Sequence, residues 1–89
     1  MSMITEPRTG RAVSLAEYIE EAVRRAIVNC ESDGCTATVP ELPGCITWGE
    51  TPDDARRNLR DAVEAWVLTA IRFGDPVPAL GEVCLAYTA

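Results

Sequence analysis

The sequence contains no histidine and no lysine, and all eight of its basic residues are arginine. Without histidine there is no imidazole to serve as the general base of Ser–His or Cys–His catalytic schemes. Carboxylates remain, but Asp53 and Asp54 fall in the first turn of a predicted helix, where the helix dipole already explains their presence. We therefore expect a protein that is not an enzyme and that has no cofactor.

Long apolar runs are also missing. None approaches the roughly 20 residues that a membrane-spanning helix needs. The N-terminal segment Met1–Pro7 has neither the basic start nor the apolar centre of a signal peptide. The 89 residues suffice for one domain with a thin hydrophobic core. We expect a cytoplasmic protein that does not bind membranes.

The net charge of −6 is unevenly distributed along the chain. Residues 26–50 contain no basic residue but four acids, Glu31, Asp33, Glu41 and Glu50. Such a surface disfavours direct nucleic-acid binding and favours a basic partner. Acidity kept only for solubility is an equally good interpretation of the charge alone.

The four cysteines stand at positions 30, 35, 45 and 84. Structural zinc sites prefer pairs of ligands two to four residues apart, usually on knuckle turns, and this spacing offers no such knuckle. We therefore expect no bound metal. In a cytosolic chain the cysteines are expected to be reduced and to behave as small apolar residues.

Two helices are predicted. Ser14 and Glu17 form a capping box before a short helix over residues 15–25. Thr51 caps a longer helix that begins with Pro52 and ends before Gly74. Its apolar residues recur at helical spacing and form one stripe, made of Ala55, Leu59, Ala62, Val63, Trp66, Val67, Ala70 and Ile71.

Four strands are predicted around these helices. Residues 26–31 can continue the first helix, but the β-branched Ile27-Val28 pair and the Asp33-Gly34 turn favour a strand. The other strands span residues 35–39, Cys45–Gly49 and Val83–Tyr87. Residues 1–13 show no periodicity and are predicted to be a mobile arm, followed by one domain over residues 14–89.

The predicted order is α-β-β-β-α-β, an α+β fold in which one long helix covers a small, mainly antiparallel sheet as a two-layer sandwich. The hairpin turn at residues 32–34 places Cys30 opposite Cys35, within reach of a disulfide. Alternation along the third strand places Ile46 and Trp48 on the sheet face away from the long helix. That face is either an oligomer interface or is covered by the first helix or the arm.

Three sequence features resemble the HicB family, the antitoxin half of bacterial HicA–HicB toxin–antitoxin pairs. They are the hairpin turn Asp33-Gly34, the run Val-Pro-Glu-Leu-Pro-Gly-Cys at Val39–Cys45, and the helix start Gly49-Glu50-Thr51. A further match is the Gly74-Asp75-Pro76 turn after the long helix. The resemblance covers roughly residues 26–80 and implies a truncated ribonuclease-H-like core without catalytic acids.

The resemblance implies an antitoxin-like protein that binds a small basic HicA-type ribonuclease and blocks its active site. Residues expected to face this toxin partner are Glu31, Asp33, Glu41, Leu42 and Glu50. Few residues follow Leu80, so the operator-binding segment of many HicB proteins has no counterpart and we expect no direct DNA binding. The alternative is a stand-alone homo-oligomeric domain of the same fold, with a structural or adaptor role and no toxin partner. Under both hypotheses we expect a homodimer or tetramer, joined either by the sheet faces that hold Ile46 and Trp48 or by edge strands.

Overall fold

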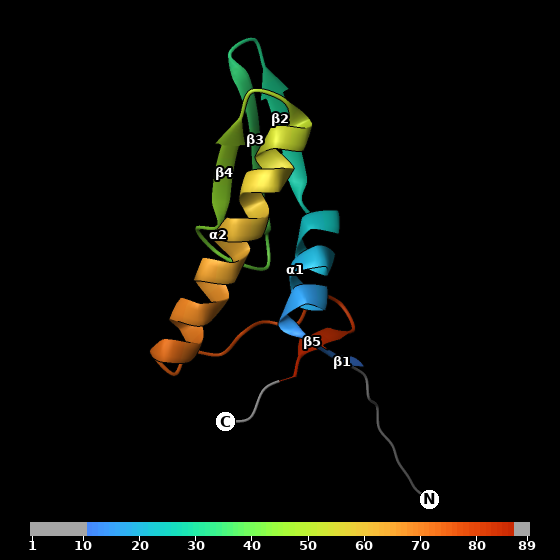
Figure 1. Ribbon diagram of the computed structural model, residues 1–89, viewed down its shortest axis with the longest axis vertical. Helices are drawn as coiled ribbons and strands as arrows, with labels where there is room; N and C mark the ends of the chain where they lie inside the picture. The colour runs from blue at the N-terminus through green and yellow to red at the C-terminus, as the bar shows by residue number, and fades with distance from the viewer. Residues whose placement is uncertain (1–10, 87–89) are drawn as a thin grey trace, which may run out of the picture.

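Residues 11–86, the part of the chain that the computed structural model describes, form two helices and five strands (Figure 1). The fold is α+β, and α2 covers a three-stranded antiparallel sheet. The elements in chain order are β1 (Arg11–Val13), α1 (Leu15–Arg24), β2 (Ile27–Glu31), β3 (Gly34–Thr38), β4 (Ile46–Gly49), α2 (Pro52–Arg72) and β5 (Val83–Leu85).

The central sheet has the strand order β2-β3-β4, with both pairings antiparallel. The predicted hairpin is confirmed, because residues 27–31 form a strand and do not continue α1. The turn between β2 and β3 ends at Gly34, whose φ of +145° is a conformation that favours glycine. β4 begins at Ile46, one residue later than expected, after the loop that contains both prolines.

Both helices begin where their capping residues predict. The Oγ of Ser14 accepts a hydrogen bond from the N–H of Glu17 at 3.2 Å, and the Glu17 carboxylate accepts one from the N–H of Ser14 at 3.1 Å. Thr51 accepts a hydrogen bond from the N–H of Asp54 at 3.1 Å at the start of α2. Gly74 follows the end of α2 with a φ of +73°, as expected of the glycine that ends a helix.

The predictions about the two ends of the domain need correction. Residues 11–13, predicted as part of a mobile arm, form β1, which pairs in parallel with β5. β5 therefore lies in a separate two-stranded sheet rather than in the central sheet (Figure 1). The observed order is β-α-β-β-β-α-β. The rest of the predicted arm, residues 1–10, and the predicted strand end at Tyr87 lie outside the described residues.

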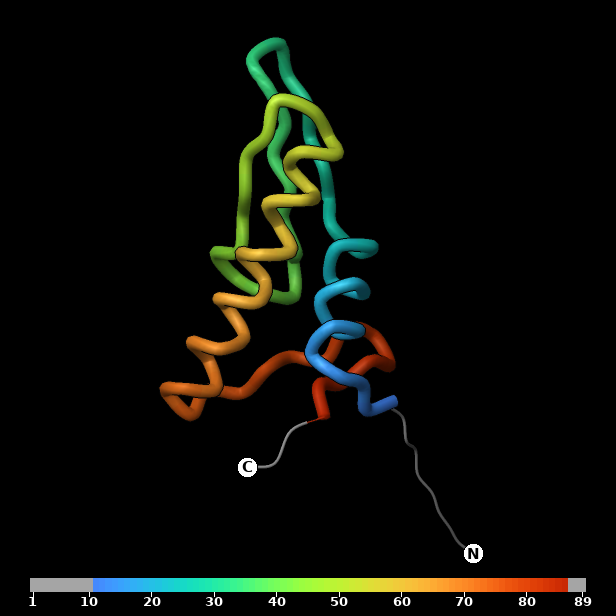
Figure 2. Tube along the Cα trace, viewed as in Figure 1, coloured from blue at the N-terminus to red at the C-terminus, as the bar shows by residue number. Residues whose placement is uncertain are grey.

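Figure 2 shows how α2 crosses the central sheet and how α1 lies beside α2. Buried residues of α1, α2 and the inner face of the central sheet form one hydrophobic core. α2 contributes Leu59, Val63 and Val67, and β3 contributes Cys35 and Ala37, all of them buried. α1 packs mainly against α2 and β5. Within residues 11–86, neither helix combines the length and the apolar character that crossing a bilayer requires.

Candidate protein-binding surface

The face of the central sheet that α2 leaves uncovered is called the outer face here. Alternation along the strands places seven side chains on it: Ile27, Asn29, Glu31, Thr36, Thr38, Ile46 and Trp48. Ile27, Ile46 and Trp48 are 51%, 57% and 52% exposed, so α1 does not cover them. Three large apolar side chains on one small face are typical of a contact surface.

Trp48 lies against the backbone of the β2–β3 turn. A Cβ added to Gly34 would come within 2.4 Å of the indole ring, so the ring passes directly over this glycine. Asn29, Glu31, Asp33 and Thr36 complete a shallow depression of about 210 Å³ around Gly34 and Trp48. The depression therefore combines an aromatic ring with two carboxylates.

The acidic residues Glu31, Asp33 and Glu50 gather at the end of the sheet that holds the β2–β3 turn. Gly49 lies opposite Cys35, so the β4–α2 turn with Glu50 adjoins the β2–β3 turn (Figure 1). Within residues 11–86, no ion pair involves these three carboxylates. We call this group the acidic end.

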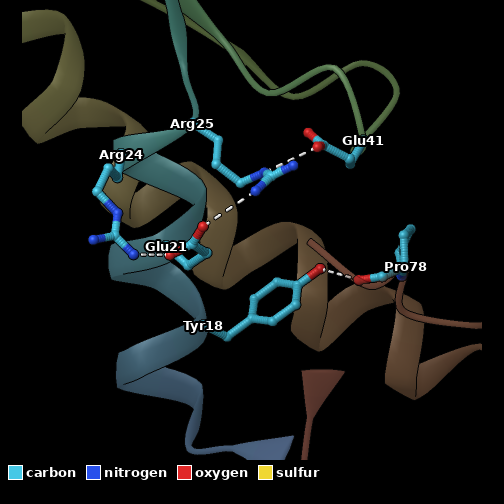
Figure 3. A network of polar contacts seen from close by, with 6 residues as sticks. All are labelled: Tyr18, Glu21, Arg24, Arg25, Glu41 and Pro78. Atoms are coloured by element: carbon cyan, nitrogen blue, oxygen red, sulfur yellow. Dashed lines mark hydrogen bonds and ion pairs between the residues drawn. The ribbon is translucent and has the colours of Figure 1, made fainter. Parts of the chain in front are cut away.

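Glu41 does not belong to the acidic end. It lies in the β3–β4 loop at the opposite end of the sheet, where its Oε2 accepts a hydrogen bond from Nε of Arg25 at 3.0 Å (Figure 3). This bond, together with a second one from Arg25 to Glu21, raises the pKa of Arg25. Glu41 therefore holds the loop to the end of α1, while its side chain is 28% exposed and its contact with a partner stays a prediction.

Leu42 does not lie on the surface, contrary to the prediction that it contacts a partner. Its side chain is 1% exposed and belongs to the hydrophobic core. The prolines on either side suggest an exposed loop, but the loop folds back onto α2, where the indole Nε1 of Trp66 donates a hydrogen bond to the carbonyl of Pro43 at 3.0 Å. Leu42 cannot contact a partner in this conformation.

Tyr18 anchors the segment between α2 and β5. Its ring is fully buried, and its hydroxyl donates a hydrogen bond to the carbonyl of Pro78 at 2.5 Å (Figure 3). Burial and the nearby Glu41 carboxylate raise the pKa of Tyr18 to about 12. The hydroxyl therefore remains a donor throughout the neutral pH range.

Replacing Tyr18 with phenylalanine should lower the free energy of unfolding by about 1–3 kcal/mol, because the Pro78 carbonyl loses its donor while the ring packing is kept. Urea unfolding of both proteins at pH 7 measures the difference. If the two urea unfolding curves had equal midpoints and equal slopes, water would replace the Tyr18 hydroxyl at the Pro78 carbonyl without a loss of stability.

The cysteines do not gather into one cluster. Cys30 and Cys35 lie directly opposite each other, as predicted, but their sulfurs are joined in a disulfide, whereas the sequence favoured a reduced pair. Cys45 is a free, buried thiol whose pKa is raised by burial, and Cys84 is free and partly buried. Within residues 11–86, no three His, Cys, Asp or Glu side chains are grouped closely enough to hold a metal ion.

Two features of the surface were not identified from the sequence. The first is Ile27, which lies on the outer face together with Ile46. Its position could have been predicted, because alternation along the strand places it on the face opposite to Val28. A second feature is an open apolar groove of about 540 Å³ between the start of β4 and α2, lined by Ile46, Ala62, Ala65 and Trp66 among others. No local pattern predicts this groove, because it depends on how α2 crosses the sheet.

Comparison with known proteins gives a consistent picture. A family described as UPF0150-like matches residues 17–78. The UPF0150 protein Ta0767 of Thermoplasma acidophilum is 32% identical over 53 residues, which cover 58% of this chain and 77% of that protein. A UPF0150 protein of Helicobacter pylori is 33% identical over 42 residues, which cover 47% of this chain and 58% of that protein.

A solved structure has the same fold. The crystal structure of TTHA0281 from Thermus thermophilus superposes with a TM-score of 0.74 at 31% sequence identity. The match covers 84% of this chain and 95% of that one. The fold described above is therefore shared with that protein over nearly its whole length.

Proposed function

The chain belongs to the UPF0150-like family, and from this premise we propose that it is an antitoxin-like protein-binding domain. Its partner would be a small basic ribonuclease of the HicA type, whose active site it would occlude. The sequence features that resemble HicB antitoxins are the hairpin turn at Asp33-Gly34, the run Val39–Cys45 and the helix start at Gly49-Glu50-Thr51. A truncated ribonuclease-H-like core belongs to the same proposal.

The depression around Trp48 is the observation that supports this function best. It combines an indole ring with the carboxylates of Glu31 and Asp33. A cation over an aromatic ring, with carboxylates beside it, is a favourable arrangement for an arginine or lysine side chain. Glu50 adds a third negative charge nearby, so the acidic end should attract a basic protein over a distance.

Co-expression with a small basic protein encoded next to this chain tests the proposal. We expect a complex that survives purification at physiological salt. Replacing Glu31, Asp33 and Glu50 with the corresponding amides should weaken it by about tenfold and reduce its salt dependence, since exposed ion pairs contribute up to about 1 kcal/mol each. The absence of any complex, or of any such neighbour, would contradict the proposal.

A matched control separates local contacts from net charge. Asp61, Glu64 and Glu82 are exposed and lie outside the acidic end. Converting these three to amides removes the same total charge, and it should leave affinity within about threefold of the wild type. Equal losses in both triple variants would mean that net charge, and not the acidic end, determines binding.

A second candidate is a stand-alone homo-oligomeric domain with a structural or adaptor role. The exposure of Ile27, Ile46 and Trp48 on one face favours it, because this surface remains in contact with water in a single copy. Self-association and binding of a toxin are compatible if they use different surfaces of the domain.

A further inference from the structure

β2 is an edge strand whose outward backbone groups can be identified from its pairing with β3. The Thr38 hydroxyl donates to the carbonyl of Ile27 at 3.5 Å, so that carbonyl points toward β3. Backbone groups of successive residues in a strand point to opposite sides. The N–H and C=O of Val28, and those of Cys30, therefore point away from the sheet.

Two further observations agree with this assignment. The Cα atoms of Cys30 and Cys35 are 4.0 Å apart, which matches the close spacing of a pair that exchanges no backbone hydrogen bonds. The N–H of Val39 donates to the carbonyl of Cys45, so odd-numbered residues of β3 face β4 and even-numbered residues face β2. Within residues 11–86, no hydrogen bond involves the outward groups of Val28 and Cys30.

The edge formed by β2 is open, whereas the edge formed by β4 is partly closed. On β4, the side-chain amide of Asn58 donates a hydrogen bond to the carbonyl of Trp48 at 2.8 Å. β2 has no proline, no lysine and no bulge, the usual devices that prevent edge pairing. Its only charge is Glu31, at the end of the strand.

We infer that β2 pairs with β2 of a second copy of this chain, antiparallel about a twofold axis that passes beside Asn29. In this register Val28 of each copy lies opposite Cys30 of the other, and the four outward groups of each strand form hydrogen bonds. The two central sheets become one sheet of six strands. This pairing deepens the homo-oligomeric candidate function and does not require a toxin.

Charge complementarity identifies the occupant as a second copy. In the antiparallel arrangement the beginning of one β2 lies beside the end of the other, so the C-terminus of α1 approaches the acidic end of its partner. Arg24, which pairs with Glu21 of its own chain but keeps a side chain 75% exposed, then lies near Glu31 and Asp33 of the second copy. The two Glu31 side chains stay about 13 Å apart, four strand residues, so like charges do not meet.

The pairing and the proposed toxin-binding function share part of one surface, because Asn29, Glu31 and Asp33 also line the depression around Trp48. An added strand extends the sheet sideways and leaves the outer face of both copies uncovered. Trp48 lies on β4, two strands away from the new contact. Dimerisation is therefore measured on this chain by itself and toxin binding by co-expression, so that the failure of one proposal is distinguished from the failure of the other.

A cysteine at the twofold axis tests this arrangement directly. Asn29 is exposed, and Asn29→Cys would bring two thiols within disulfide distance across the dimer. We expect most of the oxidised protein to migrate as a covalent dimer, at twice the 9.6 kDa chain mass, in non-reducing electrophoresis. The control Thr36→Cys places the thiols three strand spacings apart, roughly 14 Å, so it should form no covalent dimer and should migrate as a single chain in the same gel.

A charge variant provides the solution measurement. Sedimentation over a concentration series should show a dimer for the wild type and at least tenfold weaker dimerisation for Asn29→Asp, which sets two carboxylates opposite each other. Thr36→Asp adds the same charge away from the axis and should dimerise within about threefold of the wild type. A monomeric wild type at millimolar concentration would overturn the inference. A dimer that Trp48→Glu dissociates and Asn29→Asp does not would also overturn it, in favour of the outer face.

Discussion

Replacing Leu42 with alanine is expected to lower the free energy of unfolding by about 2–5 kcal/mol, the usual cost of emptying a fully buried leucine site. The side chain is 1% exposed and closes the core beneath the β3–β4 loop. In a domain of this size each kcal/mol corresponds to roughly 4–8 °C in Tm. The variant should therefore melt at least about 8 °C below the wild type.

Leu68→Ala is the matched control for this prediction. It removes the same atoms from a side chain on α2 that is 50% exposed, and it should cost less than about 1 kcal/mol. Thermal unfolding followed by circular dichroism measures both variants. Similar losses for the two would mean that Leu42 is not a core residue, and the prediction of a partner contact at this position would return.

Replacing Gly49 with alanine is expected to cost about 3 kcal/mol or more, at the upper end of the usual range for overpacking. A Cβ at this position would lie 2.4 Å from the backbone nitrogen of Ala55 and 2.7 Å from the carbonyl carbon of Asp54. Both are backbone atoms in the first turn of α2, so no side chain can rotate out of the way. The start of the helix must move away from the sheet.

Gly44 provides the comparison, because its backbone conformation and not a lack of space favours glycine there. Its φ is +82°, and no atom lies within 4 Å of the position that a Cβ would take. Asparagine tolerates this backbone conformation, so Gly44→Asn should cost less than about 1 kcal/mol. If Gly49→Ala melts within about 2 °C of the wild type, α2 shifts without loss of packing.

The helices and the hairpin were predictable because their signals are local. The Ser14–Glu17 capping box, the Thr51–Pro52 start and the Asp33-Gly34 turn each act within a few residues, and each is found where expected. The pairing of β1 with β5 was not predictable in the same way. Three residues contain no periodicity to detect, and their partner lies at the other end of the chain.

On the candidate surface, too, local patterns were predictable from the sequence and contacts between distant segments were not. Strand alternation placed Ile46 and Trp48 on the outer face, where they are exposed. Composition alone grouped Glu41 with the other acids of residues 26–50, but three-dimensional folding separates it from them and pairs it with Arg25. Charge along a sequence does not reveal which carboxylates already have partners from another element.

The parallel pairing of β1 with β5 has a consequence for how the molecule opens. Arg11 lies opposite Val83, so this small sheet closes a loop of about 70 residues, and the chain must lose the entropy of that closure before the contact can form. The three-residue pairing forms few hydrogen bonds to compensate this cost. The entropy cost of pairing β2 with β3 is much smaller, because only a short turn separates these strands. The β1–β5 pair should therefore assemble last during folding and be the first part to exchange its amide hydrogens with solvent.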